Sequence, residues 1–403
     1  MGFLRFLIDN RLFLLAGVLL SFTSSYGQTY FISIFAADIM RDFGLSNGQW
    51  GGIYTAGTTL SALVMVQAGV LTDRFRVRGL SAFVAVGLAL ACLAMAVVPG
   101  AALLVGVIFA LRFFGQGMMS TLAIVAMARW FVGARGRALS VASMGFNIGQ
   151  AVLPILFVAL LARYDWRLLW VIAAGLVLLT IPAFNVLLRQ ERSPRSMASD
   201  SVALGMEGRH WTRGQAVRHP LFWLMMPALI GPPAWGTALF FQQVHLATVK
   251  GWALGQFVAL YPLFTVASVA ATFAAGAAID RFGTWRIVPV YLVPYVVSFL
   301  IIGWFPSIGM AAVGLVIFAL GTGMQATLPG AFWAEYYGTQ HLGAIKAVAV
   351  AIMVFGSAIG PGISGVLIDL GVDFPVQMIG YAVYFVLAGV MATIGVLRYR
   401  RRR

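Results

Sequence analysis

The chain has 403 residues, of which 61% are apolar and only 10% are charged, and its formal net charge is +15 at pH 7. Soluble domains carry roughly 25% charged residues, so this composition excludes a water-soluble enzyme and indicates a surface that faces lipid. The apolar runs are continuous, which disfavours a transmembrane β-barrel with its alternating strands of about ten residues. The single cysteine, Cys92, excludes an intrachain disulfide and a thiolate metal cluster.

Twelve apolar runs follow one another, each about as long as a membrane-crossing helix. We predict spans at 12–37, 47–72, 80–99, 101–128, 138–162, 167–189, 220–247, 253–279, 285–305, 308–333, 343–369 and 374–397. The first run has no small-residue cleavage site, so we expect a retained helix and not a signal peptide. The sequence therefore predicts an all-α membrane protein with twelve transmembrane helices.

The basic residues are divided unevenly between the two sides that these spans define. With a cytoplasmic N-terminus, 22 of the 27 Lys and Arg residues lie inside, and only Arg41, Arg163, Arg167 and Lys250 lie outside. This distribution follows the positive-inside rule and predicts a multi-pass protein of the cell inner membrane with both termini cytoplasmic. The arginines at 400–403 are expected to contact anionic lipid headgroups, not nucleic acid.

The second half of the sequence repeats the first at an offset of 207 residues. The two copies share a glycine, an aspartate and an arginine, which are Gly69, Asp73 and Arg74 in the first copy and Gly276, Asp280 and Arg281 in the second. A polar stretch separates them. We therefore predict two pseudo-symmetric six-helix halves, 1–189 and 220–403, joined by a cytoplasmic linker at 190–219.

The segment after the second predicted helix resembles the signature loop of the major facilitator superfamily, G-x-L-x-D-R-x-G-R-R/K. It reads GVLTDRFRVR from Gly69, with Arg76 where glycine is usual, and its second copy reads GAAIDRFGTWR from Gly276. The resemblance covers nearly the whole chain and implies the major facilitator fold, with substrate bound between two halves that rock during alternating access.

The resemblance also implies that the six shared residues form an inner gate. The glycines would let two helices approach closely. Asp73 and Asp280 would pair with arginines or cap a neighbouring helix, in contacts that break as the halves rock. The open alternative is that both aspartates merely cap a tight inner loop.

The fourth predicted helix contains RFFGQGM from Arg112, which resembles the R-x-x-x-G-x-G motif of the superfamily. Arg112 lies about eleven residues into its span, roughly 16 Å deep, where a charge is expensive and needs a partner or a wet cavity. Two interpretations stay open. Arg112 bonds carbonyls of the first helix and fixes the first half, or it contacts an anionic substrate or takes part in coupling.

None of the twelve acidic residues lies at the predicted membrane centre. Coupling of transport to protons would therefore use the carboxyl of the substrate, a histidine or a carboxylate near a helix end. The alternative is transport without a coupled proton. His245 is the only histidine within a predicted span, and an interfacial hydrogen bonder is the alternative to a proton carrier.

Lys346 opens the eleventh predicted helix and resembles the substrate-contacting lysine of oxalate:formate antiporters and monocarboxylate porters. A lysine that snorkels to the inner interface is the alternative. The eighth predicted helix lacks the arginine of that branch, which argues against a full dicarboxylate clamp.

Polar and aromatic side chains on apolar spans tend to face the interior of a helix bundle. The candidate substrate-binding set consists of Gln28, Tyr30, Arg112, Gln116, Asn147, Gln150, Trp235, Gln242, Tyr261, Gln325 and Lys346. Ordinary helix packing is the alternative explanation for any one of these side chains. The group as a whole indicates a substrate-binding site. Leu153 and Pro154 stand where drug antiporters of the superfamily have Gly-Pro, which argues against drug efflux.

We therefore expect a secondary transporter that takes up a small organic anion. Three alternatives stay open. The substrate is a neutral or heterocyclic nutrient such as a vitamin, the protein is an exporter, or it is a receptor that does not transport. The sequence has no HExxH, GxSxG or P-loop motif, so we expect no enzyme, no cofactor and no metal site. The expected partners are the substrate and membrane lipid, with a coupling proton or a counter-substrate left open, and we expect a monomer.

Overall fold

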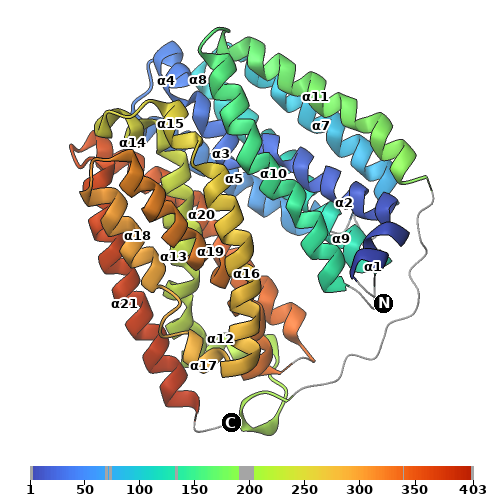
Figure 1. Ribbon diagram of the computed structural model, residues 1–403, viewed down its shortest axis with the longest axis vertical. Coiled ribbons are helices and arrows are strands. Elements are labelled where there is room, and N and C mark those ends of the chain that lie inside the picture. Colours follow the sequence, from blue (N-terminus) through green and yellow to red (C-terminus); the bar gives the residue numbers. More distant parts are fainter. Residues whose placement is uncertain are drawn as a thin grey trace. The chain divides into compact units, whose positions relative to one another are not determined.

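The computed structural model describes residues 3–68, 71, 75–131, 135–189, 204–338 and 340–400. Within these ranges the regular secondary structure is helical, without strands. The chain divides into two compact units, Met1–Ser199 and Asp200–Arg403, each of which is described by itself. Figure 1 labels their helices.

The first unit builds six membrane-crossing segments. Its described helices are α1 (Phe3–Asp9), α2 (Arg11–Thr23), α3 (Thr29–Ile32), α4 (Ala36–Phe43), α5 (Asn47–Ala68), α7 (Val77–Val97), α8 (Ala101–Leu111), α9 (Ser120–Trp130), α10 (Arg135–Leu161) and α11 (Trp166–Leu187). The main packing pairs are α2 with α10, α5 with α8, and α7 with α11, and the last pair runs side by side in Figure 1.

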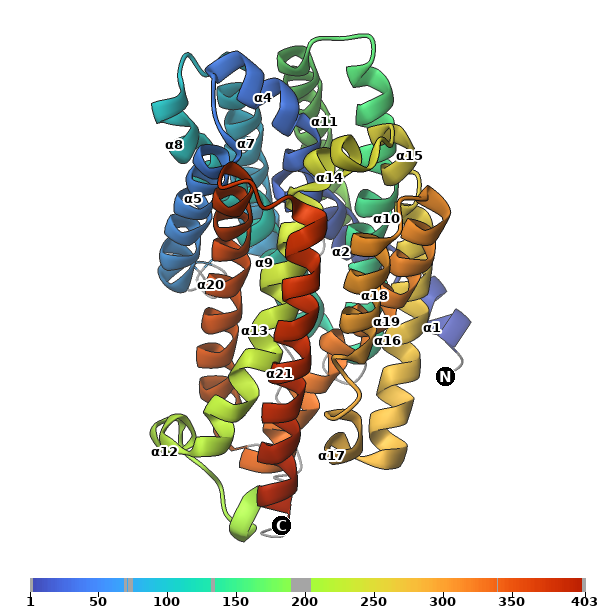
Figure 2. The same ribbon diagram turned by 90° about the vertical axis from the view of Figure 1, so that its left-hand side faces the viewer.

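The second unit repeats this pattern. Its helices are α12 (Arg213–Arg218), α13 (Pro220–Phe241), α14 (Gln243–Lys250), α15 (Leu254–Val258), α16 (Tyr261–Phe282), α17 (Thr284–Ile287), α18 (Val293–Trp304), α19 (Ile308–Tyr337), α20 (Leu342–Asp369) and α21 (Phe374–Arg400). Figure 2 shows α13 and α18 on either side of α21, which packs against both. The pairs α13 with α20, α16 with α19, and α18 with α21 match the three pairs of the first unit. The internal repeat of the sequence is thus a repeat of helix packing.

Ten helical segments of the described chain are long and apolar enough to cross a membrane. The first two predicted spans are not among them. The first is interrupted, and the second, α5, mixes glycine, threonine and serine with its apolar residues. With these two, the helices account for the twelve predicted spans.

The first membrane-crossing segment is broken near its middle. After α2, residues Ser24–Gly27 form a 3₁₀ turn, and Gln28 is extended (φ −88°, ψ 153°) before α3 begins. The prediction of one helix over 12–37 is therefore wrong at this point. Ser24 and Ser25 compete with helical hydrogen bonding, and a Cβ on Gly27 would overlap the carbonyl oxygen of Leu111.

The seventh segment is interrupted as well. It runs as α13 to Phe241 and resumes as α14 at Gln243, because Gln242 has non-helical backbone angles (φ −87°, ψ 16°). The continuous span predicted at 220–247 is corrected accordingly. Three prolines lie within α13, where each removes a backbone donor.

The second part of the predicted linker is folded. Residues 190–203 lie outside the described ranges, but Thr212 and Gln215 cap the short helix α12. The backbone nitrogen of buried Trp211 donates to the carbonyl of Tyr337 at 3.1 Å. This part of the linker therefore packs on the second unit.

Candidate functional site

Arg112 begins a π-helix, Arg112–Met119, between α8 and α9. Such wide turns are rare and are frequent at functional sites. The Arg112 side chain is only 2% exposed. The structure therefore buries a guanidinium group in the first unit, as the depth of Arg112 in its span predicts.

The partners of Arg112 come from the break in the first segment and from α5. Its Nη1 donates to the Gly27 carbonyl at 3.0 Å and lies 3.5 Å from the Thr29 hydroxyl oxygen. Its guanidinium carbon lies 5.4 Å from the centre of the Tyr54 ring, and the Tyr54 and Thr29 hydroxyls are 2.6 Å apart. All these groups are neutral, and within the described chain no carboxylate pairs with Arg112.

Two glycines let the broken segment and the π-helix touch. A Cβ on Gly115 would lie 2.6 Å from the Cα of Gly27, and one on Gly27 would lie 2.9 Å from the backbone nitrogen of Gln116. Gln28 and Gln116 are both half-buried and border this crossing. The structure thus brings these two predicted site residues and Arg112 to one place.

Tyr30 lies against α10. Its ring packs edge-on to Phe146, with ring centres 5.6 Å apart, and a Cβ on Gly149 would lie 3.5 Å from its hydroxyl oxygen. Asn147 is half-buried on the same helix, and Gln150 is buried. Tyr30 and this part of α10 form a second group of predicted residues within the first unit.

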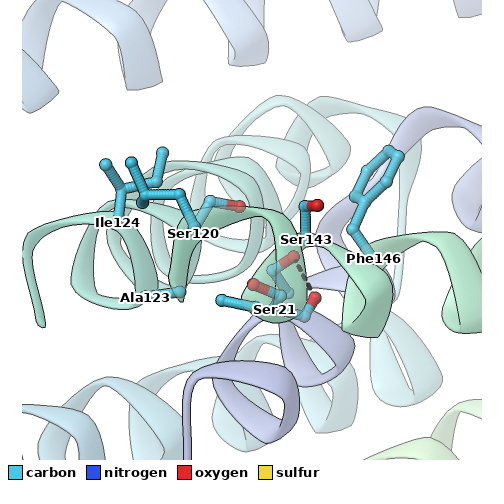
Figure 3. Close-up of a pocket in the computed structure, with 9 residues that line it drawn as sticks. Ser21, Ser120, Ala123, Ile124, Ser143 and Phe146 are labelled. Atoms are coloured by element: carbon cyan, nitrogen blue, oxygen red, sulfur yellow. Dashed lines mark hydrogen bonds between the residues drawn. The ribbon is translucent and has the colours of Figure 1, made fainter. Parts of the chain in front are cut away.

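A cavity of about 190 Å³ opens in the first unit between α2, α9 and α10 (Figure 3). It is lined by Ser21, Ser24, Ser120, Ala123, Ile124, Leu139, Ala142, Ser143 and Phe146. The sequence analysis did not predict this cavity, because serine and alanine residues on an apolar helix are typical of ordinary helix packing. The concentration of small residues on three segments was the available signal.

Gln242 belongs to a hydrogen-bond network in the second unit. Its Nε2 donates to the Ser364 hydroxyl at 3.0 Å, and Gln377 Nε2 donates to the Ser364 carbonyl at 3.0 Å. The Tyr381 hydroxyl donates to Gln377 at 2.6 Å, and Trp235 stacks on the Tyr381 ring with centres 4.1 Å apart. The network ties the break after α13 to α20 and α21. The sequence prediction named Gln242 and Trp235 but not their three partners.

Tyr261 and Gln325 have different surroundings. The buried hydroxyl of Tyr261 donates to Gln243, the neighbour of the predicted Gln242. Both amide atoms of Gln325 and the indole nitrogen of Trp235 are buried, and they make no hydrogen bond with the described residues. Buried polar atoms normally have a partner, and these three atoms have none among the described residues.

Lys346 is half-buried one turn into α20 and lies against α19. A Cβ on Gly330 would lie 3.4 Å from its Nζ. Within the described residues Lys346 forms no ion pair. It is thus a second cation without a carboxylate partner in that part of the chain.

The first copy of the predicted gate, with Gly69, Asp73 and Arg74, lies outside the described residues. In the second copy, a Cβ on Gly276 would meet no described atom within 4 Å. The close approach of two helices at this glycine stays a prediction.

An acidic side chain caps the start of α17 in this region. Glu335 accepts hydrogen bonds from the Thr284 backbone nitrogen at 3.2 Å and the Thr284 hydroxyl at 2.7 Å, at the start of α17. Asp280 makes no hydrogen bond or ion pair with described residues, and the Arg281 guanidinium lies 5.3 Å from the Phe282 ring centre. The sequence analysis assigned no role to Glu335.

His245 lies in α14, beyond the break after α13. Its Nε2 is 3.5 Å from Asp373 Oδ1, and its side chain is 17% exposed. The pair joins α14 to the connection between α20 and α21. This contact fits the interfacial role that the sequence left open.

The family model of the Major Facilitator Superfamily matches residues 17–324 and 259–403 of this chain. The chain belongs to the major facilitator superfamily. The predicted membership of the superfamily and its twelve-helix fold are confirmed. No curated protein sequence matches the chain.

Solved structures of transporters resemble this one over nearly its whole length. A bacterial homologue of the human lysosomal transporter Spinster, inward-facing and unoccupied, is 16% identical with a TM-score of 0.75, covering 97% of this chain and 98% of its own. Its occupied form has the same identity and score, with 97% of each chain covered. An aspartate-to-alanine mutant of the nucleoside transporter NupG is 10% identical with a TM-score of 0.70, covering 97% and 99%. At these identities the likeness concerns the fold.

Proposed function

We propose that this member of the superfamily takes up a small organic anion with a carboxylate group by alternating access. The observation that carries the proposal is the buried guanidinium of Arg112, whose partners Gly27, Thr29 and Tyr54 are all neutral. A lone charge in the membrane costs at least about 2.5–3.5 kcal/mol on insertion scales. Carbonyl groups solvate a guanidinium but do not neutralise it, whereas a carboxylate does so with two charge-assisted hydrogen bonds.

The other predicted residues take supporting roles in this proposal. Gln28 and Gln116 lie beside Arg112 and supply amide hydrogen bonds to the substrate. Lys346 supplies a second positive charge, as its resemblance to the lysine of oxalate:formate antiporters and monocarboxylate porters implies. Asp73 and Asp280 belong to the inner gate, and either a coupling proton or a counter-substrate drives the cycle.

The second candidate function is transport of a neutral heterocyclic nutrient. The stacked rings of Trp235 and Tyr381 and the unbonded amide of Gln325 favour it. Flat aromatic surfaces with nearby amide groups suit a planar solute. The two candidate functions differ in the charge of the ligand. A binding screen with charged and neutral compounds therefore distinguishes them.

A thermal-shift screen followed by uptake into proteoliposomes tests the proposal. We expect carboxylates to raise the apparent melting temperature of the purified protein, because a ligand at 100 times its Kd stabilises the folded state by about 2.7 kcal/mol. The matched primary amides serve as the control and should have no effect. Equal stabilisation by an acid and its amide would contradict the anion proposal and favour the neutral nutrient.

We further expect both termini to be cytoplasmic, because the basic residues gather on one side of the membrane. Reporter fusions after Gly208 and after Arg403 should report the cytoplasm, and fusions near Pro99 and Gly371 should report the opposite side. A signal from the opposite side after Gly208 would contradict the six-plus-six arrangement.

A further inference from the structure

One wall of the cavity in the first unit includes Ser24, which belongs to the same 3₁₀ turn as Gly27. Ser24, in its lining, precedes Gly27 by three residues in the 3₁₀ turn. With a rise of roughly 2 Å per residue, the Gly27 carbonyl that accepts from Arg112 lies about 6 Å along the chain from Ser24. Ser120, on the opposite wall, follows the π-helix Arg112–Met119 and is eight residues from Arg112 in the sequence. The buried guanidinium and the cavity are thus connected through the turn Ser24–Gly27 of the first unit.

The walls of the cavity are apolar in character despite four serines. Ser24 Oγ donates to the Ser21 carbonyl at 2.6 Å, and Ser143 Oγ donates to the Ser140 carbonyl at 2.8 Å. A serine hydroxyl that donates to a carbonyl of its own helix has no proton left to donate to a ligand. Besides Ser21 and Ser120, the remaining lining residues are two alanines, two aliphatic residues and Phe146. The surface therefore suits a hydrocarbon group and offers little to a sugar or a second carboxylate.

The volume of the cavity limits what it accepts. It measures about 190 Å³, and an apolar cavity of about 150 Å³ is large enough to bind benzene. A phenyl ring, or an alkyl chain of similar volume, fits.

We propose that this cavity is the subsite for the apolar body of the substrate, so that the anion recognised near Arg112 is a carboxylate with an alkyl or aryl chain. This inference rests on the proposed function and narrows its substrate class. An acyl chain of a bilayer lipid has the same chemistry. The closeness of Ser24 to Gly27, which holds Arg112, favours the chain of a carboxylate.

Calorimetric titration of the full-length protein in nanodiscs with butanoate, hexanoate and benzoate tests the inference. Each buried methylene should strengthen binding about fourfold, so hexanoate should bind about 15-fold more tightly than butanoate. Ser143→Leu fills part of the cavity from α10 and should lower the affinity for hexanoate about tenfold, and the affinity for butanoate, whose chain is two methylenes shorter, by less. Ser140→Leu is the matched control, one turn earlier on an exposed face and outside the lining, and should change neither affinity.

Ser120→Leu fills the cavity from the opposite wall and replaces Ser143→Leu if that variant does not fold. Affinity that does not depend on chain length would overturn the inference, and it is the result expected if a lipid acyl chain occupies the cavity. An equal loss for butanoate and hexanoate in both filling variants would also overturn it. Failure of all three acids to bind would instead contradict the proposed anion function.

Discussion

Arg112→Gln should weaken carboxylate binding more than 100-fold, equivalent to about 2.7 kcal/mol. The substitution removes the positive charge near the break in the first segment, and the neutral groups of Gly27, Thr29 and Tyr54 supply no replacement. Calorimetric titration of the monodisperse fraction measures this loss separately from any loss of folded protein. Arg112→Lys keeps the charge but loses the paired donors of the guanidinium, so we expect an intermediate loss of about tenfold.

Thr29→Val is the matched control for a purely structural role. It removes the hydroxyl that lies 3.5 Å from Arg112 Nη1 and 2.6 Å from the Tyr54 hydroxyl, yet it keeps the charge. We expect lower thermal stability with affinity within about threefold of the parent, because losing one hydrogen bond has a modest effect. If Arg112→Gln behaves in the same way as Thr29→Val, Arg112 only ties the helices together, and the neutral nutrient becomes the better candidate.

Gly145→Ala should destabilise the protein severely, by about 3 kcal/mol or more. A Cβ at this position in α10 would overlap the carbonyl oxygen of Val18 in α2, so the two backbones must separate. Overpacking in a core costs about 1–3 kcal/mol when only side chains have to shift, and here the main chain must move. The apparent melting temperature and the monodisperse fraction after purification measure the effect.

Gly175→Ala is the control for this prediction, because a Cβ at that exposed position in α11 meets no described atom within 4 Å. Alanine is the better helix former by about 0.8–1.0 kcal/mol, so we expect an unchanged or raised melting temperature. Gly360→Ala, in the corresponding helix pair of the second unit, would overlap the carbonyl oxygen of Ala234 and should resemble Gly145→Ala. A melting temperature of Gly145→Ala equal to that of Gly175→Ala would show that α2 and α10 separate easily.

The fold was largely predictable, because apolar runs and the repeated Gly-x-x-x-Asp-Arg pattern are local properties of the sequence. The break at Gln28 was not, because it depends on contacts of Gly27 with Leu111 and Gly115, which are distant in sequence. In the seventh segment, α13 continues through its three prolines and ends only before Gln242. The amino-acid composition of a segment does not predict the residue at which its helix is interrupted.

The sequence predicted which types of residue form the candidate site, but not which residues bond to one another. Polarity on an apolar span singled out Gln242 and Gln325 equally, yet one is bonded to Ser364 and the other makes no hydrogen bond within the described chain. The carboxylate that caps α17 is Glu335 and not Asp280, because the fold brings Glu335 to Thr284 from another helix. Tertiary packing decides which helix a side chain faces, and a single sequence does not contain this information.

The position of Cys92 determines how access to the site can be measured. This single thiol is completely buried in α7, so a water-soluble maleimide meets no reactive native target in the folded protein. Cysteines placed one at a time at Gln28, Gln116 or Gln325 would then each report their own accessibility to the reagent, in an otherwise unaltered polypeptide. Labelling from either side of sealed vesicles, with and without carboxylate, would follow the transport cycle without first constructing a cysteine-free background.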